Sequence, residues 1–456
     1  MPALRNSTAS SIESPVAGKR ELPVARFRES GFSKALASLV FLATIFPYVT
    51  PLETPFDTQP YALILALLFV VHASVSTGIF SFQIPRYFLI LVLILAVALV
   101  RFFEEDPDFG SLRSLVGYVT IVAIGLASYH GFALIKPKLF VVCMGIWFGV
   151  AVVQTTFWRE FGGVLLSRMS TTADRGITGL AVEPSYLAIC CVFFLLLNDF
   201  FSLRAGYGER AYRAVFVMLV LQVFMAASSL GFILLFVYLL SRLIAQRQLL
   251  GFVRASAAGA VLFVVSALAF AVVPSLAAGR ASQLIEKLSA GPQVLIFTDA
   301  SIAERLLDVI VAPISLGSHG GMGFGLDAWA TSGQSVIEGA GEFVHKLTLV
   351  DPAGHSERLM SGWGAAIFEL GLVGVGLVLI FLMLANRSVR HSAGIAERRI
   401  TSASAITIFV MMMIAVPLAF PLFGYFIGIF FAIANRPPGL VELSSADFRL
   451  SGLRLT

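Results

Sequence analysis

Apolar segments long enough to form membrane-spanning helices recur along almost the whole chain, separated mostly by short polar connections. A spanning helix needs about 20 apolar residues, or somewhat fewer where it is partly buried in protein. The pattern predicts an all-α polytopic membrane protein with about 12 transmembrane helices. The expected spans are residues 33–50, 60–80, 84–103, 114–133, 138–158, 184–201, 211–227, 231–247, 255–275, 361–385, 401–416 and 421–435.

The amino-acid composition supports this class. Of 456 residues, 58% are hydrophobic and 13% are charged, whereas soluble globular domains average about 25% charged residues. Cys143, Cys190 and Cys191 fall inside apolar segments without metal-ligand spacing, so they are expected to be small core residues. The one acidic run, Glu104-Glu-Asp-Pro-Asp108, is interpreted as a solvated outer loop rather than a divalent-cation site. No metal site and no cofactor are predicted.

The order of polar and apolar segments predicts five regions. Residues 1–32 are polar and lack the apolar core of a signal peptide, which indicates a disordered cytoplasmic N-terminal tail. Residues 33–275 hold the first nine spans, 276–360 form a large periplasmic loop, and 361–435 hold the last three spans. Residues 436–456 form a C-terminal tail. An even number of spans places both termini in the cytoplasm.

The distribution of Lys and Arg orients these spans. With the N-terminus inside, 22 of the 32 Lys and Arg residues lie on the cytoplasmic side, and every short inner loop is basic. This is the positive-inside pattern of membrane proteins. The ten outside residues are Arg101, Arg113, Arg159, Arg168, Arg175, Arg280, Lys287, Arg305, Lys346 and Arg358.

The large outer loop carries signs of order. Loops beyond about 15 residues are usually functional or disordered, and here Ser301-Ile-Ala-Glu304 is a capping box that predicts a helix start. Pro313 and Gly317 predict its end, with Arg305 on its polar side. The predicted apolar stripe of this helix is Ile302, Leu306, Val309 and Ile310. The Gly317–Gly325 segment that follows has five glycines in nine residues, which suits either an anion-binding loop or a flexible elbow.

Two outer segments carry candidate chemistry next to spans. Pro184 suits the first turn of a helix, so Glu183 is expected at a helix mouth, with Arg168 and Arg175 on the loop outside it. These residues could form a site for an anionic lipid, or Glu183 could cap the helix beside ordinary loop charges. His355 precedes the tenth span, where Trp363 predicts the membrane interface, so it is expected level with Glu183 as a site residue or a solvated histidine.

Several of these motifs together resemble the O-antigen polymerase and ligase superfamily (Wzy-like and WaaL-like proteins). Glu183-Pro-Ser-Tyr186 follows an Arg-rich outer loop, and ten residues separate Arg168 from Gly179, as in the family. Eleven residues separate Arg305 from Gly317, which departs from that spacing. The turn at 228–231 and the Glu369–Gly374 segment are also similar to family features. The resemblance covers roughly residues 60–435.

The resemblance implies a metal-independent glycosyltransferase whose donor is a polyprenyl-diphosphate-linked glycan. Arg168, Arg175 and Arg305 would bind the diphosphate, because a guanidinium holds phosphate oxygens bidentately and keeps its charge. Glu183 or His355 would be the general base for the acceptor hydroxyl.

Three functions are compatible with the sequence. The first is a repeat-unit polymerase of O-antigen or exopolysaccharide synthesis at the outer face of a bacterial inner membrane. The second is an O-antigen ligase-type transferase, and the third is a transporter or flippase, although carriers usually have short loops and mid-bilayer sites. The expected partners are the lipid-linked oligosaccharide, membrane lipid, a chain-length regulator and a flippase. No nucleic-acid partner is expected.

The charge distribution predicts where reporter fusions will be active. Fusions at residues 300 and 340 should report an extracytoplasmic position, and fusions at 208 and 392 a cytoplasmic one. Paired alkaline phosphatase and fluorescent-protein fusions measure this directly. A cytoplasmic signal from residue 300 would overturn the proposed chemistry, because lipid-linked repeat units are polymerised outside.

Overall fold

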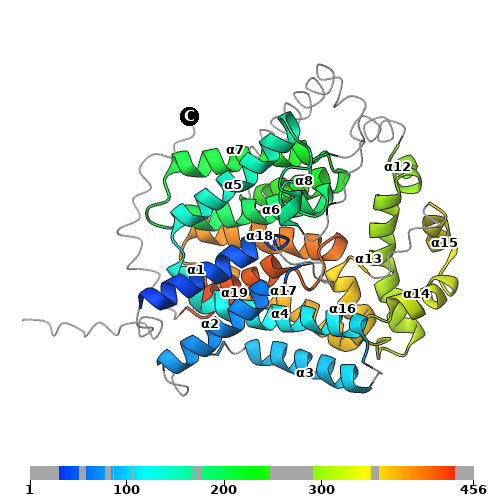
Figure 1. The fold of residues 1–456 in the computed structure, drawn as a ribbon. Coiled ribbons are helices and arrows are strands. Elements are labelled where there is room, and N and C mark those ends of the chain that lie inside the picture. The colour runs from blue at the N-terminus through cyan, green and yellow to red at the C-terminus, as the bar shows by residue number, and fades with distance from the viewer. Residues whose placement is uncertain are drawn as a thin grey trace, which may run out of the picture.

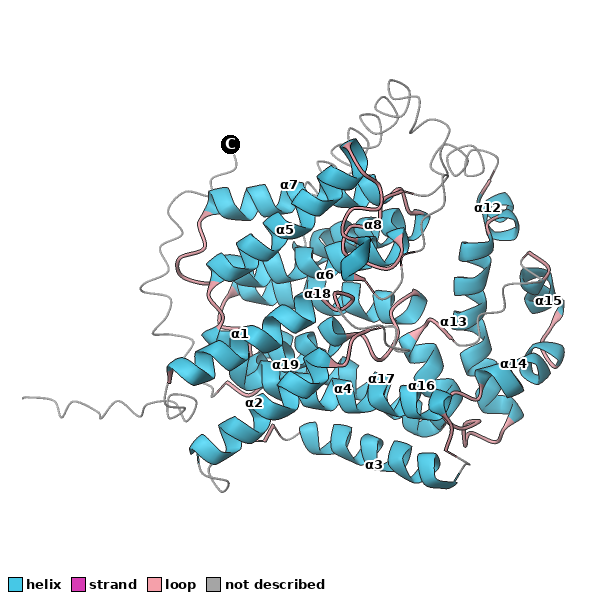
Figure 2. Cartoon of the chain, viewed as in Figure 1, coloured by secondary structure: helices cyan, strands magenta, loops and turns pink. Residues whose placement is uncertain are grey.

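The computed structural model describes a chain whose regular elements are helices (Figure 2). The one β feature in the described part is an isolated bridge between Val49 and Leu166. The described residues are 30–50, 58–77, 84–85, 87–104, 107–166, 169, 176–246, 291–350 and 359–436.

The helices of the main bundle follow the predicted spans closely. The ninth predicted span, 255–275, lies outside the described residues. The helices are α1 (Gly31–Ile45), α2 (Tyr61–Thr77), α3 (Phe88–Glu104), α4 (Phe109–Gly131), α5 (Pro137–Thr156), α6 (Pro184–Ser202), α7 (Glu209–Ala226), α8 (Ser229–Gln246), α16 (Gly362–Leu370), α17 (Leu372–Arg390), α18 (Ile395–Ile414) and α19 (Pro421–Ala434).

Several of these helices have the character of membrane spans. Large apolar side chains on α2 and α3 face outward, among them Val71 at 61% and Leu93 at 63% exposure, as expected of a lipid-facing surface. Twelve crossings remain a prediction, because in the described part five helices are long and apolar enough to cross a membrane. Those five are Phe109–Leu134, Pro137–Thr156, Pro184–Ser202, Ser229–Gln246 and Leu372–Arg390.

The contacts between connecting segments follow the predicted alternation of the chain. Segments predicted on the same side of the membrane lie together at the same end of the bundle. At one end, Val49 bridges Leu166, the Thr58 hydroxyl donates to the Ala419 carbonyl oxygen, and Ile177 N–H donates to the Met225 carbonyl oxygen. At the other, Arg204 donates to the carbonyl oxygens of Phe132 and Ile135, Arg387 donates to that of Ala434, and Arg436 pairs with Glu397.

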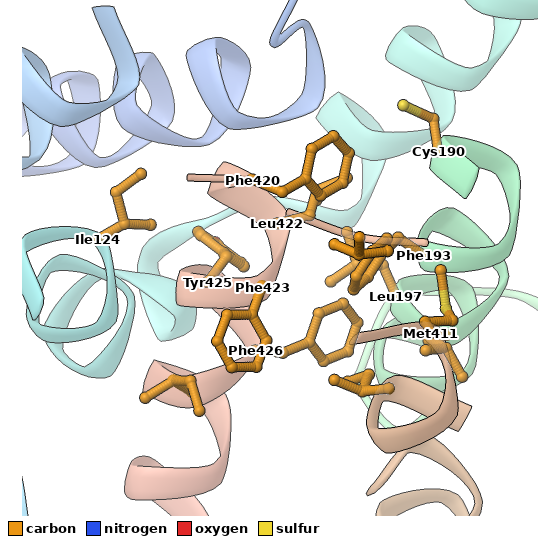
Figure 3. Packing of buried hydrophobic residues seen from close by; sticks show 14 of the residues in the cluster. Ile124, Cys190, Phe193, Leu197, Met411, Phe420, Leu422, Phe423, Tyr425 and Phe426 are labelled. Carbon is orange, nitrogen blue, oxygen red and sulfur yellow. The ribbon is translucent and has the colours of Figure 1, made fainter. Parts of the chain in front are cut away.

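Helices α6 and α19 form the centre of the bundle. Both are buried along nearly their whole length, and Figure 3 shows their aromatic side chains meeting. The Phe193 ring centroid lies 5.4 Å from that of Phe420 and 5.7 Å from that of Phe426. Cys190 and Cys191 are free thiols buried in α6, as the sequence predicts.

Glycines bring α19 unusually close to α4. A Cβ on Gly428 would lie 2.3 Å from the carbonyl oxygen of Gly125, and one on Gly424 would lie 3.2 Å from that of Thr120. The Gly424-x-x-x-Gly428 spacing puts both glycines on one face of α19, which is the common way for membrane helices to pack backbone against backbone.

The tenth predicted span is not one helix. Helix α16 ends at Leu370, Gly371 has φ of +60°, and α17 begins at Leu372. The glycine-rich loop packs against this break: a Cβ on Gly371 would lie 2.1 Å from the Gly321 carbonyl oxygen, and Leu372 N–H donates to that oxygen at 2.8 Å. The loop is therefore a structural elbow, because its glycines allow close approach of backbone to backbone.

Helices from the large outer loop gather at one side of the bundle, with α16 between (Figure 1). Phe368 of α16 belongs to their core, where its ring stacks on Phe324 at 4.8 Å. The helices are α12 (Pro292–Thr298), α13 (Ala300–Ser318), α14 (Trp329–Glu338) and α15 (Glu342–Thr348). Their core consists of Leu307, Val311, Trp329, Val336, Ile337, Val344, Leu359 and Phe368.

The structure differs from four sequence predictions for this region: the cap, the end and the buried stripe of α13, and the place of Trp363. Helix α13 is capped by Asp299, which accepts from Ile302 N–H at 3.2 Å, rather than by the box at Ser301. The helix continues through Pro313 to Ser318. Trp363 is 3% exposed within the bundle instead of marking the interface. The buried stripe of α13 is Ala303, Leu307, Val311 and Ala312, one register away from the predicted positions, because the helix turns toward α16.

The close packing of α4 on α19 predicts a position-specific effect of adding one methyl group. Gly428→Ala should destabilise the protein by about 1–3 kcal/mol, because the new Cβ would meet rigid backbone. Gly376→Ala in α17, where a Cβ would meet no described atom within 4 Å, should be neutral or slightly stabilising. Thermal unfolding of the two purified variants in one detergent measures the difference. Equal melting temperatures would contradict the packing account.

Candidate functional site

Glu183 lies at the N-terminal end of α6, as predicted, and Pro184 occupies the first turn. The backbone of Glu183 is extended at the N-cap position, but its carboxylate makes no capping hydrogen bond. The Ser185 hydroxyl donates to it at 3.4 Å. Side-chain capping is therefore not the role of Glu183, and its partly exposed carboxylate lies at the mouth of the helix.

The segment before Glu183 is fixed by Gly179, the glycine of the Arg–Gly motif. Gly179 has φ of +58°, a left-handed conformation that favours glycine. The buried Gln154 side chain holds its backbone on both sides, accepting from Gly179 N–H at 2.8 Å and donating to its carbonyl oxygen at 2.9 Å. Arg168 and Arg175 lie outside the described residues.

Tyr186, one helical turn into α6, joins this helix to the segment that leads into α16. Its hydroxyl lies 3.6 Å from Sδ of Met360, and its ring packs edge-on against Tyr48 at 5.6 Å. Met360 directly follows the segment that contains His355, and His355 itself lies outside the described residues. The start of α16 is thus held against the start of α6.

Asp308 of α13 anchors the same segment from the outer layer. Its Oδ2 accepts from the backbone N–H groups of Met360, at 2.9 Å, and Ser361, at 3.3 Å. The residue is 1% exposed. Burial raises the pKa of its carboxyl to about 7, against the opposing charge of Arg305 and with a smaller contribution from Glu304. Asp308 was not among the predicted site residues, although the Arg-x-x-Asp spacing places it one turn from Arg305.

Arg305 is a partly buried arginine with unused donors. Its Nε and Nη1 atoms are enclosed and have no hydrogen-bond partner among the described residues. A guanidinium in this state is a ready donor to an oxyanion, because burial strengthens the attraction that its charge exerts. Gly317, its proposed motif partner, lies in α13, where an added Cβ would meet no described atom within 4 Å, so it does not repeat the geometry of Gly179.

These contacts link the segments that carry two of the predicted site residues, Glu183 and Arg305. A chain of contacts runs from the start of α6 through Tyr186 and Met360 to Asp308, whose carboxyl is influenced by the charge of Arg305 three residues earlier. Glu183 lies at one end of this chain and Arg305 at the other. The arrangement offers a carboxylate, a buried guanidinium and the backbone that follows His355 at the same end of the bundle.

Glu104 and Asp108, the described ends of the acidic run, are exposed and contribute to helix structure, whereas Glu105 and Asp106 lie outside the described residues. Asp108 caps α4 by accepting from Ser111 N–H at 2.6 Å, and this bond lowers the pKa of its carboxyl. Glu104 pairs with Arg101 at 3.3 Å. Within the described ranges, no group of three or more His, Cys, Asp or Glu side chains is placed to hold a metal ion.

The chain matches no protein-family model, and no curated protein matches it either.

The raised pKa of Asp308 predicts a pH-dependent stability difference. A carboxyl whose pKa is higher in the folded protein contributes stability that is present below about pH 4 and is lost as the pH rises through about 7. Asp308→Asn should keep an oxygen acceptor for both N–H groups, but its free energy of unfolding should not fall with pH in this way. The fall in the wild type is at most about 1.4 kcal/mol per pH unit. Thermal unfolding between pH 5 and 8 should therefore favour the variant increasingly as pH rises.

Glu342→Gln is the matched control, since Glu342 is an exposed residue of the same outer layer, paired with Lys346. The melting temperature of Glu342→Gln should change with pH in the same way as that of the wild type. Parallel pH profiles for Asp308→Asn and the wild type would show that Asp308 ionises normally.

Proposed function

We propose that this protein is a repeat-unit polymerase of O-antigen or exopolysaccharide synthesis. It transfers a growing glycan from a polyprenyl-diphosphate carrier to the next lipid-linked repeat unit. The observation that carries the proposal is the enclosed guanidinium of Arg305, which has two nitrogens without partners among the described residues. An unmade hydrogen bond in a buried site costs about 1–3 kcal/mol, and a phosphate oxygen would remove that cost.

The remaining roles follow from the chemistry of a diphosphate leaving group. Arg305, with Arg168 and Arg175 from the loop before α6, binds the diphosphate of the donor and stabilises the charge that develops as it leaves. Glu183 or His355 accepts the proton of the acceptor hydroxyl. Each of these residues lies on a segment predicted to face the periplasm.

The transfer step balances without a metal or redox partner. The acceptor hydroxyl oxygen attacks the anomeric carbon of the donor, and a new glycosidic C–O bond forms. The C–O bond to the diphosphate breaks, and the polyprenyl diphosphate leaves with the bonding electron pair. The hydroxyl proton passes to the general base. The diphosphate is a good leaving group once its charge is neutralised, so its departure needs no protonation.

The reaction belongs at the outer face of the bacterial inner membrane, with both termini in the cytoplasm. Several apolar helices support the membrane setting. A chain-length regulator and a flippase are the protein partners that such a reaction would need, one to limit polymer length and one to deliver repeat units.

The arginine role can be tested by comparing Arg305→Lys with Arg305→Ala. Lysine keeps the positive charge but lacks the planar fork of the guanidinium. Cells that contain normal amounts of either variant should therefore make mainly single repeat units instead of polymer. The same outcome is expected for Arg168→Lys. Arg398→Ala, an exposed arginine at the opposite end of the bundle, serves as the matched control and should give full-length polymer. Wild-type chain lengths from Arg305→Ala would remove this residue from the site.

The base role can be tested by assaying Glu183→Gln and His355→Ala side by side with purified enzyme and lipid-linked repeat unit. A lost general base should slow transfer by about 10²–10⁴-fold. The loss of a charge at a helix N-terminus alone would cost only about 0.3–1 kcal/mol of stability. A near-wild-type rate for Glu183→Gln with an inactive His355→Ala would assign the base to the histidine. Glycan joined to lipid A–core instead of longer polymer would identify a ligase.

A further inference from the structure

A cavity of about 80 Å³ lies between α4, α16 and the segment that precedes α19. It adjoins the proposed reaction site, because Leu359 lines it and the next residue, Met360, is held by Asp308. A single water needs only about 10–15 Å³ measured in this way, so there is room for a larger group. The lining combines polar and aromatic side chains: Thr58, Arg113, Asp327, Trp329, Phe368 and Glu369.

An ion pair between Arg113 and Asp327 forms part of the cavity wall. Nη2 of Arg113 lies 3.1 Å from Oδ1 of Asp327, and the two side chains are 23% and 20% exposed. Both partners therefore keep some surface open while the pair holds their orientation. A carboxylate and a guanidinium fixed side by side can accept from one hydroxyl group and donate to its neighbour.

The backbone of Asp327 is held in an uncommon conformation. Its φ is +58°, which is rare for a residue other than glycine. Its N–H donates to Oε1 of Glu369 at 3.1 Å, so both backbone and side chain of Asp327 are fixed. Strained conformations of this kind persist where the surrounding structure enforces them, and they are concentrated at binding sites.

Glu369 holds the cavity wall together. Its carboxylate accepts from the Ser114 hydroxyl at 2.7 Å and from the Tyr118 hydroxyl at 2.8 Å, in addition to the Asp327 N–H. Ser114 and Tyr118 belong to α4, whereas Glu369 belongs to α16. These bonds therefore join the membrane bundle and the outer layer at the floor of the cavity.

The aromatic part of the lining is also rigid. The Trp329 and Phe368 rings meet edge to face with centroids 5.3 Å apart. A Cβ on Gly333 would lie 2.8 Å from the indole, so the glycine lets this ring pack tightly against α14. Trp329 thus offers a fixed apolar surface next to the Arg113–Asp327 pair.

The charge of the lining restricts the class of ligand. Arg113 is already paired with Asp327 at 3.1 Å, and Glu369 adds a second carboxylate to the lining, so the cavity offers a diphosphate no uncommitted positive charge. Arg305 differs, because its Nε and Nη1 have no partner among the described residues. An alkyl chain would displace water from the partly exposed ion pair and offer it no hydrogen bond in return, which is costly. A sugar ring fits both features, because its hydroxyl groups exchange hydrogen bonds with a carboxylate and a guanidinium while its C–H face contacts an aromatic ring.

We propose that this cavity binds a sugar ring of the lipid-linked repeat unit, with Asp327 and Arg113 bonding neighbouring hydroxyl groups beside Trp329. The inference rests on the proposed polymerase function and assigns a glycan subsite to it. The proposed diphosphate site and the proposed sugar site both adjoin the segment of Leu359 and Met360, because Asp308, three residues from Arg305, holds Met360 and Leu359 lines the cavity. Selection among repeat units therefore depends on the cavity, and activation of the donor depends on the arginines.

The experiment measures the binding affinities of two probes for the purified full-length protein in nanodiscs. One probe is the free oligosaccharide of one repeat unit, released from its lipid by mild acid, and the other is undecaprenyl diphosphate without sugar. Asp327→Asn keeps the N–H bond to Glu369, and Ala365→Val narrows the cavity without removing a polar group. Each should weaken oligosaccharide binding at least about tenfold, as expected for losing a charged hydrogen bond or the space for the ring.

The same two variants should bind undecaprenyl diphosphate as the wild type does, whereas Arg305→Ala should show the reverse pattern. Glu342→Gln, which changes an exposed ion pair in the outer layer, should leave both affinities unchanged. Unaltered oligosaccharide binding in Asp327→Asn and Ala365→Val would overturn the subsite, as would a wild type that does not bind the oligosaccharide. Loss of sugar binding in these variants, without any Arg305-dependent binding of the diphosphate, would support the subsite and count against the polymerase.

Discussion

The break at Gly371 is the constraint on which the rest of the outer end depends. A continuous tenth helix would pass through the bundle and leave the outer layer attached only by loops. Because Gly371 adopts a positive φ and lies against the Gly321 backbone, α16 becomes a short helix with its own direction. That helix belongs to two cores, since Trp363 packs in the bundle and Phe368 packs among α13 and α14.

The position of α16 determines which polar groups meet. Its first residues present backbone N–H groups to Asp308, and its last turn presents Glu369 to Ser114 and Tyr118. The carboxylates of Asp308 and Glu369 are both buried, and each accepts hydrogen bonds from several donors. This is expected, because a buried carboxylate without donors is costly. Arg305 differs, because two of its buried nitrogens have no partner in the described chain. This imbalance is the observation on which the proposed diphosphate site rests.

Local rules in the sequence predicted much of the fold, whereas features that depend on contacts between distant residues were not predictable. Pro184 at the first turn of α6 was predictable because proline there loses no hydrogen bond. Gly371 looks like any small residue in an apolar run, and its effect appears only once Gly321, fifty residues earlier, lies against it. Asp308 was missed for the same reason, since its partners at 360 and 361 are distant in sequence. The places of three predicted site residues outside the described part remain predictions: Arg168, Arg175 and His355.

A processive polymerase has to recognise two chemically different parts of each lipid-linked substrate. The diphosphate is common to every donor and needs fixed positive charge, whereas the sugar is specific to the polymer and needs directional hydrogen bonds. A guanidinium that is paired with a carboxylate to bind hydroxyl groups, as Arg113 is with Asp327, is less available to a diphosphate than one with unused donors. The two proposed sites use different parts of α16. Asp308, near Arg305 in α13, accepts from Met360 and Ser361 just before its first turn, whereas Glu369 in its last turn accepts from Asp327 N–H. The short helix produced by Gly371 therefore sets the spacing between the proposed diphosphate and glycan subsites.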